Sequence, residues 1–160
     1  MGNVVTLEDG MEAPLFSAED SAGNVWNLSD LLAQGKRVVL YFYPKDSTPG
    51  CTKQACDFRD NMGVLSSADV AVFGVSKDSA KSHQNFTEKQ ELNFPLLLDT
   101  EGELLGKYGV WREKKNYGRT YMGIARSTFV IESDGTLSMA KYGVKATGHV
   151  ARIMKHLELE

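Results

Sequence analysis

The sequence predicts an α/β fold in which helices flank a mixed central β-sheet. Two continuous apolar runs, at 38–43 and 70–75, are rich in β-branched and aromatic residues and are typical of buried strands. The stretch between them has apolar residues at helical spacing, so the two strands are expected to be parallel. Farther along, 126–143 holds two alternating runs around a turn at 133–135, which is typical of an antiparallel hairpin. A sheet with both parallel and antiparallel neighbours follows from these observations.

The first half of the chain is expected to supply a small hairpin and a strand–helix–strand unit. Residues 13–31 predict an N-terminal β-hairpin that turns at 22–24. The helix expected between the two apolar runs has four apolar side chains on one face: Ala55, Phe58, Met62 and Leu65. A strand, a helix and a second strand over this length form a βαβ unit with a right-handed crossover.

The second half is expected to add a helix over 79–92, a strand over 94–99, and a turn with a short helix in 100–110. After the hairpin, residues 147–158 predict a closing amphipathic helix. Its apolar side consists of Val150, Ile153, Met154 and Leu157. A βαβ unit followed by a hairpin and a terminal helix is the thioredoxin-like arrangement. The chain is of the usual size for one domain, so residues 1–160 are expected to form a single thioredoxin-like domain.

The composition excludes several classes of protein. Hydrophobic residues make up 42% and charged residues 24% of the chain, which argues against intrinsic disorder. No apolar run approaches the roughly 20 residues of a membrane span. The net charge of -3 gives no electrostatic reason to expect nucleic acid as a partner. No secretory signal opens the sequence, so a cytoplasmic location is expected, where paired thiols stay reduced unless they are catalytic, redox-sensing or metal-binding.

Cys51 lies where the first predicted strand gives way to the helix, directly after Thr48, Pro49 and Gly50. The first turn of a helix presents unpaired N–H groups and the positive end of the macrodipole, and both stabilise a thiolate. The thiolate is the nucleophilic form of cysteine. This position therefore favours a reactive cysteine over the small buried hydrophobe that a free cysteine usually is.

Cys56, the only other cysteine, follows five positions later. On a regular helix the two residues point roughly 140° apart, and their Cα atoms are about 8.5 Å apart. A disulfide tolerates a Cα separation of at most about 7 Å. Cys51 is expected on the core-facing side, and Cys56 near the solvent flank beside Thr52 and Arg59. The two thiols would bond only if the first turns of the helix unwound.

Three kinds of chemistry use paired cysteines. Zinc requires about four ligands, and the histidines of this chain stand at no ligand-like spacing, so a metal site is not expected. All three, His83, His149 and His156, are expected at the surface or on helix flanks. A thioredoxin-type exchanger would carry C-x-x-C, which is absent. In the remaining interpretation one thiol attacks an oxidant and becomes a sulfenic acid, and the second condenses with it to a disulfide.

Attack on a peroxide requires fixed hydrogen-bond donors near the cysteine. They stabilise the negative charge that develops on the leaving oxygen. Backbone N–H groups at the start of the helix and the Thr48 hydroxyl are candidate donors. A guanidinium would stabilise the thiolate and hold the peroxide. Composition does not identify which arginine supplies it.

The segment YFYPKDSTPGCTKQACDFRD resembles the peroxiredoxins, specifically the subfamily called PrxQ or bacterioferritin comigratory protein. It carries the motif Pro-x3-Thr-x2-Cys as Pro44, Thr48 and Cys51, and the second cysteine of this subfamily as Cys56. The similarity extends over nearly the whole chain, through APLFSAEDSAGNVWNLSDL, VFGVSKDS, NFPLLLD, YGVW and YMGIARSTFVIESDG.

The resemblance implies a role for each of these residues. Cys51 would be the peroxidatic cysteine, Thr48 would hydrogen-bond the peroxide and the thiolate, and Pro44 would shield the sulfur from water. Arg126, in GIARSTF, would be the required guanidinium. Cys56 would be the resolving cysteine of an intramolecular disulfide.

The pattern departs from that of other peroxiredoxins at one position. They often carry glutamate three residues after the peroxidatic cysteine, whereas this chain has Gln54, which leaves the partner of the arginine open. Two other arginines, Arg112 and Arg119, lie near Arg126 in sequence. They are expected to be solvated surface charges.

The residues and the resemblance agree on a thiol peroxidase without a cofactor, because neither a G-x-G-x-x-G nor a G-x4-G-K-[ST] motif is present. Its substrates would be hydrogen peroxide and organic hydroperoxides, and thioredoxin or a similar dithiol protein would reduce it. Neither nucleic acid nor a membrane is expected as a partner. An intramolecular disulfide needs no second subunit, so a monomer is expected. The alternative function is a peroxide-sensing redox switch or holdase module, which would react once where a peroxidase turns over.

Overall fold

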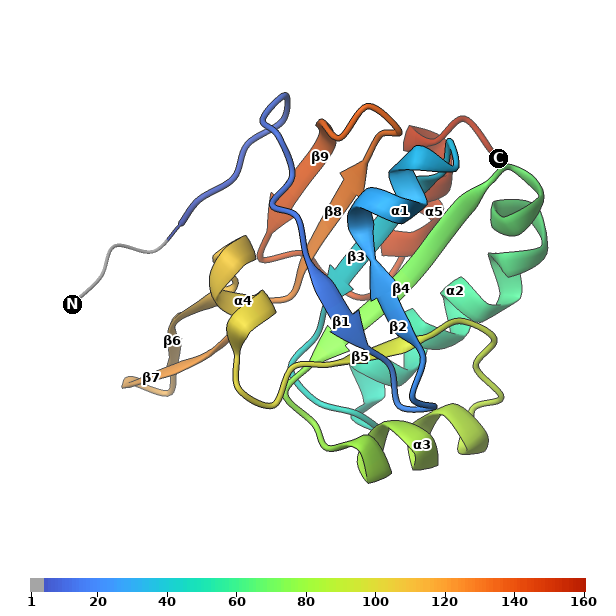
Figure 1. Ribbon diagram of the computed structural model, residues 1–160. Helices are drawn as coiled ribbons and strands as arrows, with labels where there is room; N and C mark the ends of the chain where they lie inside the picture. Colours follow the sequence, from blue (N-terminus) through green and yellow to red (C-terminus); the bar gives the residue numbers. More distant parts are fainter. Residues whose placement is uncertain (1–4) are drawn as a thin grey trace.

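The computed structural model describes residues 5–160, and a five-stranded mixed sheet lies at its centre (Figure 1). In spatial order the strands are β5 (Leu96–Leu98), β4 (Val70–Ser76), β3 (Arg37–Phe42), β8 (Ser127–Ile131) and β9 (Leu137–Tyr142). β3, β4 and β5 run parallel, whereas β8 is antiparallel to β3 and to β9. The prediction of a mixed sheet is therefore confirmed.

Helix α2 (Pro49–Ser67) joins β3 to β4, as predicted. Thr48 is its N-cap, and the proline that follows suits the first helical position, where its fixed φ fits and no N–H is needed. Three of the four apolar residues expected on its core face are buried, and the fourth, Met62, packs against the same cluster. The N-terminus of α2 thus lies beyond the carboxyl end of β3.

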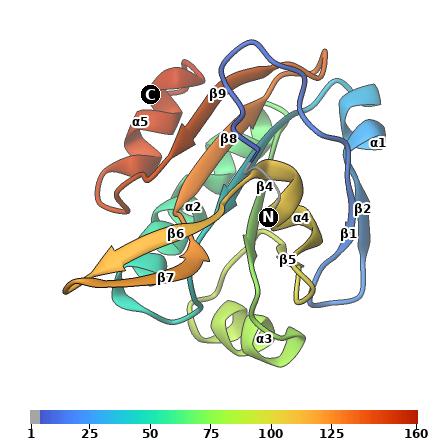
Figure 2. The same ribbon diagram turned by 90° about the vertical axis from the view of Figure 1, so that its left-hand side faces the viewer.

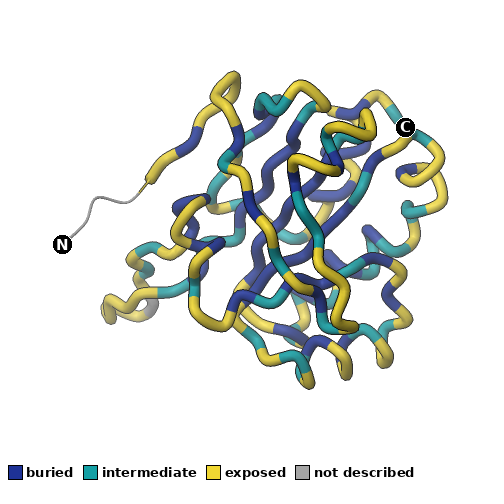
Figure 3. Tube along the Cα trace, viewed as in Figure 1, coloured by how far each residue is buried: buried dark blue, intermediate teal, exposed yellow. Residues whose placement is uncertain are grey.

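Layers of structure cover both faces of the sheet (Figures 1 and 2). One face carries α1 (Leu28–Ala33), α4 (Glu103–Tyr108) and the N-terminal hairpin, and the other carries α2, α3 (Ala80–Lys89) and α5 (His149–His156). Successive side chains of β3 contribute to the two cores in turn, because neighbours along a strand point to opposite faces. The central strands are buried along nearly their whole length (Figure 3).

The N-terminal hairpin consists of β1 (Ser17–Glu19) and β2 (Val25–Asn27), as predicted. Its turn is held by the Asp20 carboxylate, which accepts hydrogen bonds from the backbone N–H groups of Ala22 and Asn24 and from the indole of Trp26. Helix α1, which follows directly, was not predicted. Its start is marked by Asn27, whose side chain accepts a hydrogen bond from the backbone N–H of Ser29.

A second hairpin, of β6 (Trp111–Asn116) and β7 (Arg119–Ile124), was also not predicted, and it projects from the sheet (Figure 2). Tyr117 and Gly118 both have positive φ, 52° and 76°, which suits a tight hairpin turn. Most residues of β7 are exposed, so the strand does not need the alternating apolar series by which strands are recognised in a sequence.

The remaining predicted elements are present with shorter bounds. The hairpin of β8 and β9 turns where predicted, with Gly135 at a φ of 90°. Within residues 5–160, no helix combines the length and the apolar character needed to cross a membrane.

Candidate active site

Cys51 is the third residue of α2, and its side chain is almost completely buried, with 2% of the residue exposed. The backbone N–H of Thr52 donates to the carbonyl of Thr48, which closes the first turn of the helix. The turn of Thr48, Pro49 and Gly50 therefore starts the helix just before the cysteine, as the sequence predicted. A helix of this length has a well-developed positive end, which favours a negatively charged sulfur.

Arg126 lies beside this cysteine, with Nη2 3.2 Å from the Cys51 Sγ. Sheet topology explains how a residue 75 positions away comes to this place. β8 pairs antiparallel with β3 and sets Ser127 opposite Phe42, so the residue before β8 lies at the carboxyl end of β3. That end is where the chain leads into α2.

Gln54 is the partner that the sequence left open for the arginine. Arg126 donates from Nη1 to the Gln54 Oε1 at 2.6 Å. Gln54 is fully buried and lies one turn after Cys51, so both residues present their side chains to the same guanidinium. One planar guanidinium thus holds the sulfur with one nitrogen and α2 with the other.

Gly50 leaves room for this arrangement. A Cβ at this position would lie 3.3 Å from the Arg126 Nη2 and 3.7 Å from the Ala146 Cβ. The sequence singled out Gly50 only as a strand breaker. Its second function, in the close approach of Arg126, depends on a contact that no local pattern reveals.

Pro44 and Thr48 lie in the loop between β3 and α2. The Thr48 hydroxyl donates to the carbonyl of Lys45 at 3.0 Å, and the residue is half-buried at the N-terminus of α2. Pro44 is exposed. Ser47, between them, has a φ of 66°, a conformation that is uncommon for a residue with a side chain.

Cys56 is half-buried in the same helix, and both cysteines are free thiols. The Cys56 Sγ donates towards the Gln90 Oε1 at 3.5 Å, so it faces the C-terminal end of α3. Arg59 reaches the same place and donates to the carbonyl of Gln90 at 2.6 Å. The predicted placement is confirmed: Cys51 lies on the core side of one continuous helix, and Cys56 lies on its flank near Arg59.

Two of the three histidines were predicted wrongly. His83 and His149 are buried, whereas His156 is exposed as expected. The His149 Nε2 lies 2.7 Å from the Thr128 hydroxyl, and the His83 Nδ1 lies 2.7 Å from the Asp46 carboxylate. Each ring has a polar partner that offsets the cost of burial, and these partners come from distant parts of the chain.

The expectation of a solvated surface charge is also wrong for Arg112, while Arg119 is exposed. The Arg112 guanidinium lies over the ring of Tyr142, 3.9 Å from its centroid. It also donates to the carbonyl of Gly109 and to the Thr6 hydroxyl. Arg112 therefore ties the base of the β6–β7 hairpin to the N-terminal segment and to β9.

His149 is expected to make the stability of the fold sensitive to acid. Burial, together with the charges of Arg152 and Arg126, lowers the pKa of His149 to about 4 from its ordinary 6.5. The unfolded chain therefore takes up this proton first, so stability present above pH 6.5 should be lost as the pH falls from 6.5 towards 4. We expect the free energy of unfolding to decrease by about 1–3 kcal/mol over this range because of this group.

Urea unfolding of the wild type and of His149→Gln at several pH values measures this effect. His149→Gln should have a flatter dependence on pH over this window, whatever its absolute stability. The exposed His156, replaced by glutamine, is the matched control and should retain the wild-type slope. Equal slopes for the wild type and His149→Gln would show that His149 does not carry the acid sensitivity.

Comparisons with known proteins show which family this chain is similar to. Residues 10–140 match the AhpC/TSA family. The chain is 46% identical over 154 residues to peroxiredoxin Bcp of Bacillus subtilis, an alignment that covers 96% of this chain and 97% of that protein. It is 46% identical over 143 residues to peroxiredoxin Bcp of Escherichia coli, covering 89% and 90%. A solved structure of the Xanthomonas campestris bacterioferritin comigratory protein superposes on this chain with a TM-score of 0.85 at 36% identity. The alignment covers 94% of this chain and 98% of that one. That structure comes from work on the alkyl peroxide reduction activity of the Xanthomonas protein.

Proposed function

The chain belongs to the AhpC/TSA family as a peroxiredoxin of the Bcp and PrxQ type, and from this premise we propose that Cys51 is the residue with which this thiol peroxidase attacks its peroxide. The Cys51 thiolate forms a bond to one peroxide oxygen while the O–O bond breaks. The sulfur is oxidised to a sulfenic acid, and the leaving oxygen takes up a proton to become water or an alcohol.

The observation that carries this proposal is the guanidinium of Arg126 at 3.2 Å from a buried cysteine in the first turn of α2. A helix N-terminus and a guanidinium both interact favourably with negative charge. Both are fixed before the substrate arrives, so they can also stabilise the charge on the leaving oxygen without reorganisation. In this proposal the Thr48 hydroxyl turns from the carbonyl of Lys45 and donates its one hydrogen to the peroxide, and Pro44 limits the access of water to the sulfur.

Cys56 is the proposed resolving cysteine. Its sulfur attacks the sulfenic sulfur of Cys51, a disulfide forms, and water is released. To make this bond Cys56 must leave its contact with Gln90, and the turns of α2 between the two cysteines must unwind. A dithiol protein of the thioredoxin type then reduces the disulfide and is itself oxidised. The attack on the peroxide and the formation of the disulfide use residues of one chain only, which fits a monomer.

The proposed substrates are hydrogen peroxide and alkyl hydroperoxides. The work on the Xanthomonas campestris relative concerns alkyl peroxides, and this supports the second class for a chain of such similar sequence. Peroxide consumption, followed through NADPH oxidation with thioredoxin and its reductase, tests the proposal. Multiple turnovers per chain are expected, and a single turnover would instead indicate a redox sensor.

Oxidation is expected to change the order of α2 locally. Formation of the Cys51–Cys56 disulfide must break several backbone hydrogen bonds of α2. Each of these hydrogen bonds is worth about 0.5–1.5 kcal/mol. Amides from Thr52 to about Arg59 should therefore lose protection from hydrogen exchange in the disulfide form. The amides of β3 should retain theirs, because this strand is paired on both sides.

Hydrogen exchange followed by mass spectrometry on the reduced and oxidised proteins makes this comparison. The Cys51–Cys56 bond is confirmed in the same samples by peptide mapping. Equal protection of residues 52–59 in both forms would show that the disulfide forms without unwinding, and would contradict the geometric argument.

A further inference from the structure

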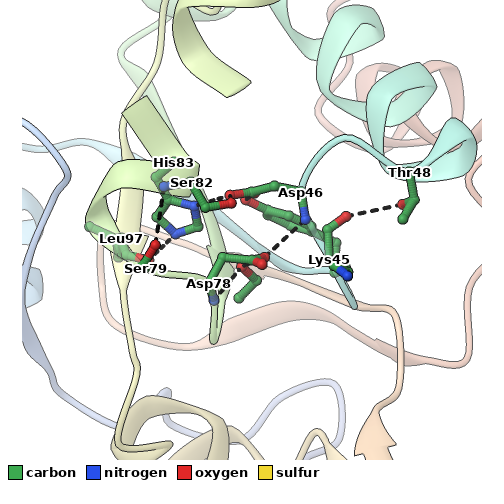
Figure 4. Close-up of polar contacts among 10 residues, drawn as sticks. Lys45, Asp46, Thr48, Asp78, Ser79, Ser82, His83 and Leu97 are labelled. Atoms are coloured by element: carbon green, nitrogen blue, oxygen red, sulfur yellow. Dashed lines mark hydrogen bonds and ion pairs between the residues drawn. The ribbon is translucent and has the colours of Figure 1, made fainter. Parts of the chain in front are cut away.

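A polar network, buried in part, joins the loop of residues 44–48 to α3 (Figure 4). At its centre Asp46, which is 5% exposed, faces the fully buried His83 of α3. The Asp46 Oδ2 lies 2.7 Å from the His83 Nδ1 and accepts a hydrogen bond from the Ser82 hydroxyl at 2.8 Å. The Asp46 Oδ1 accepts from the hydroxyl of Tyr43 at 2.5 Å.

The backbone of the loop is held as well. The N–H of Asp46 donates to the Asp78 Oδ2 at 2.9 Å, and this carboxylate oxygen also accepts from the Ser76 hydroxyl. On its other side the His83 Nε2 lies 3.0 Å from the carbonyl of Leu97. Asp46 is thus fixed through both its side chain and its main chain.

The hydrogen bonds place one proton between Asp46 and His83. The carbonyl of Leu97 can only accept, so the His83 Nε2 carries a hydrogen. The Nδ1 then either donates a second hydrogen to an ionised Asp46 or accepts one from a protonated Asp46. An asparagine at position 46 could keep this contact, because its amide can donate to a neutral His83 and its oxygen can accept from Tyr43.

The origin of these contacts indicates what the network does. Among the residues that the structure describes, the partners of Asp46 come from the end of β3, from the segment after β4, and from α3, and none comes from α2. In the proposed cycle α2 unwinds each time Cys56 reaches Cys51. A loop held only by the first turn of α2 would lose its position whenever the disulfide formed.

We propose that Asp46 and His83 are positioning residues that hold the 44–48 loop independently of α2, so that Thr48 stays in place at Cys51 through each catalytic cycle. This inference rests on the proposed role of Cys51. Asp46 acts through the loop rather than by touching the peroxide. Ser47, which lies between Asp46 and Thr48, has the positive φ described above.

A metal site is the alternative role for these residues. Ligand atoms of Asp46, Asp78 and His83 lie within 4.8 Å of one another. The oxygen and nitrogen atoms of these residues that are described above already have hydrogen-bonding partners in the network. This favours a role in positioning. If a metal held the loop, a chelator would reduce the rate of Cys51 oxidation.

The test compares Asp46→Ala with Asp46→Asn by rapid mixing with hydrogen peroxide. Asp46→Ala should slow the oxidation of Cys51 by about 10- to 100-fold, since a misplacement of about 1 Å can cost ~10² in rate. Its later conversion of sulfenic acid to disulfide should keep the wild-type rate, because that step does not use Thr48. Asp46→Asn should restore oxidation to within a few-fold of wild type.

Asp99→Ala is the matched control. Asp99 is also buried, and its carboxylate accepts from the backbone N–H groups of Leu104 and Leu105 at the start of α4, on the opposite face of the sheet. This variant should lose stability without slowing the oxidation of Cys51. If Asp46→Ala does not fold, Tyr43→Phe, which removes one donor to the same carboxylate, should give the same separation of the two rates with a smaller effect.

Three results would overturn the inference: a wild-type oxidation rate in Asp46→Ala, an equal slowing of both steps, or loss of activity when the wild-type protein is treated with EDTA. Cys51→Ser is measured in parallel. If Cys51→Ser still consumed peroxide, the proposed function would fail. If Cys51→Ser is inert and Asp46→Ala reacts like wild type, only the positioning role fails.

Discussion

Cys51→Ser is expected to abolish peroxide reduction. A serine hydroxyl at this position would remain protonated beside Arg126, and it is a far poorer nucleophile than a thiolate. The rate in the thioredoxin-coupled assay should fall to that of the reaction without enzyme. The fold should be retained, because the substitution exchanges one buried atom and leaves the first turn of α2 intact.

Cys56→Ser is the matched control for this prediction, because it removes the other thiol of the same helix. It should still be oxidised once by peroxide and then stop as a sulfenic acid, which dimedone labels at Cys51. Labelling is read by mass spectrometry of the peptide that contains residue 51. If Cys56→Ser prevented the first oxidation and Cys51→Ser did not, the two roles would be reversed.

Arg126→Ala is expected to slow the reaction of Cys51 with peroxide by about 10²–10³, the usual loss for one preorganised donor to developing charge. The variant removes the only cation described within hydrogen-bonding distance of the sulfur among residues 5–160. It also leaves Gln54 without its partner at the base of the site. The measurement is the second-order rate constant of sulfenic acid formation by rapid mixing.

Arg126→Lys should recover little of this loss. A single ammonium cannot contact the Cys51 sulfur and the Gln54 amide oxygen with two nitrogens held in one plane. Arg119→Ala is the control, since Arg119 is an exposed arginine of the neighbouring strand β7. A rate constant for Arg126→Ala within a few-fold of wild type would remove Arg126 from the catalytic mechanism.

The local part of this architecture could be predicted from the sequence. The apolar runs of β3 and β4 and the helical spacing of α2 identified the βαβ unit, and the turn of Thr48, Pro49 and Gly50 placed Cys51 in the first turn of the helix. The relation between Cys51 and Cys56 followed from helix geometry alone, because both residues lie on one continuous helix. These features depend on interactions between residues that are close along the chain.

The elements that were missed are those whose apolar pattern is weak. Helix α1 is short, and the β6–β7 hairpin has one strand that is exposed along most of its length. Neither buries a long apolar face, so hydrophobic periodicity gives little signal for either. For the β6–β7 hairpin, the turn at Tyr117 and Gly118 is a stronger indication than the apolar pattern of its strands.

Patterns within single segments were enough to predict the fold class, the position of Cys51 in the first turn of α2 and the separation of the two cysteines on that helix. The groups that surround the two cysteines depend instead on how distant segments pack together. The antiparallel pairing of β8 with β3 brings Arg126 to the sulfur, and the packing of α3 on the sheet buries His83 against Asp46. Such contacts join residues that are far apart in the chain, and they depend on strand order and side-chain packing, which periodicity and spacing within one segment do not encode.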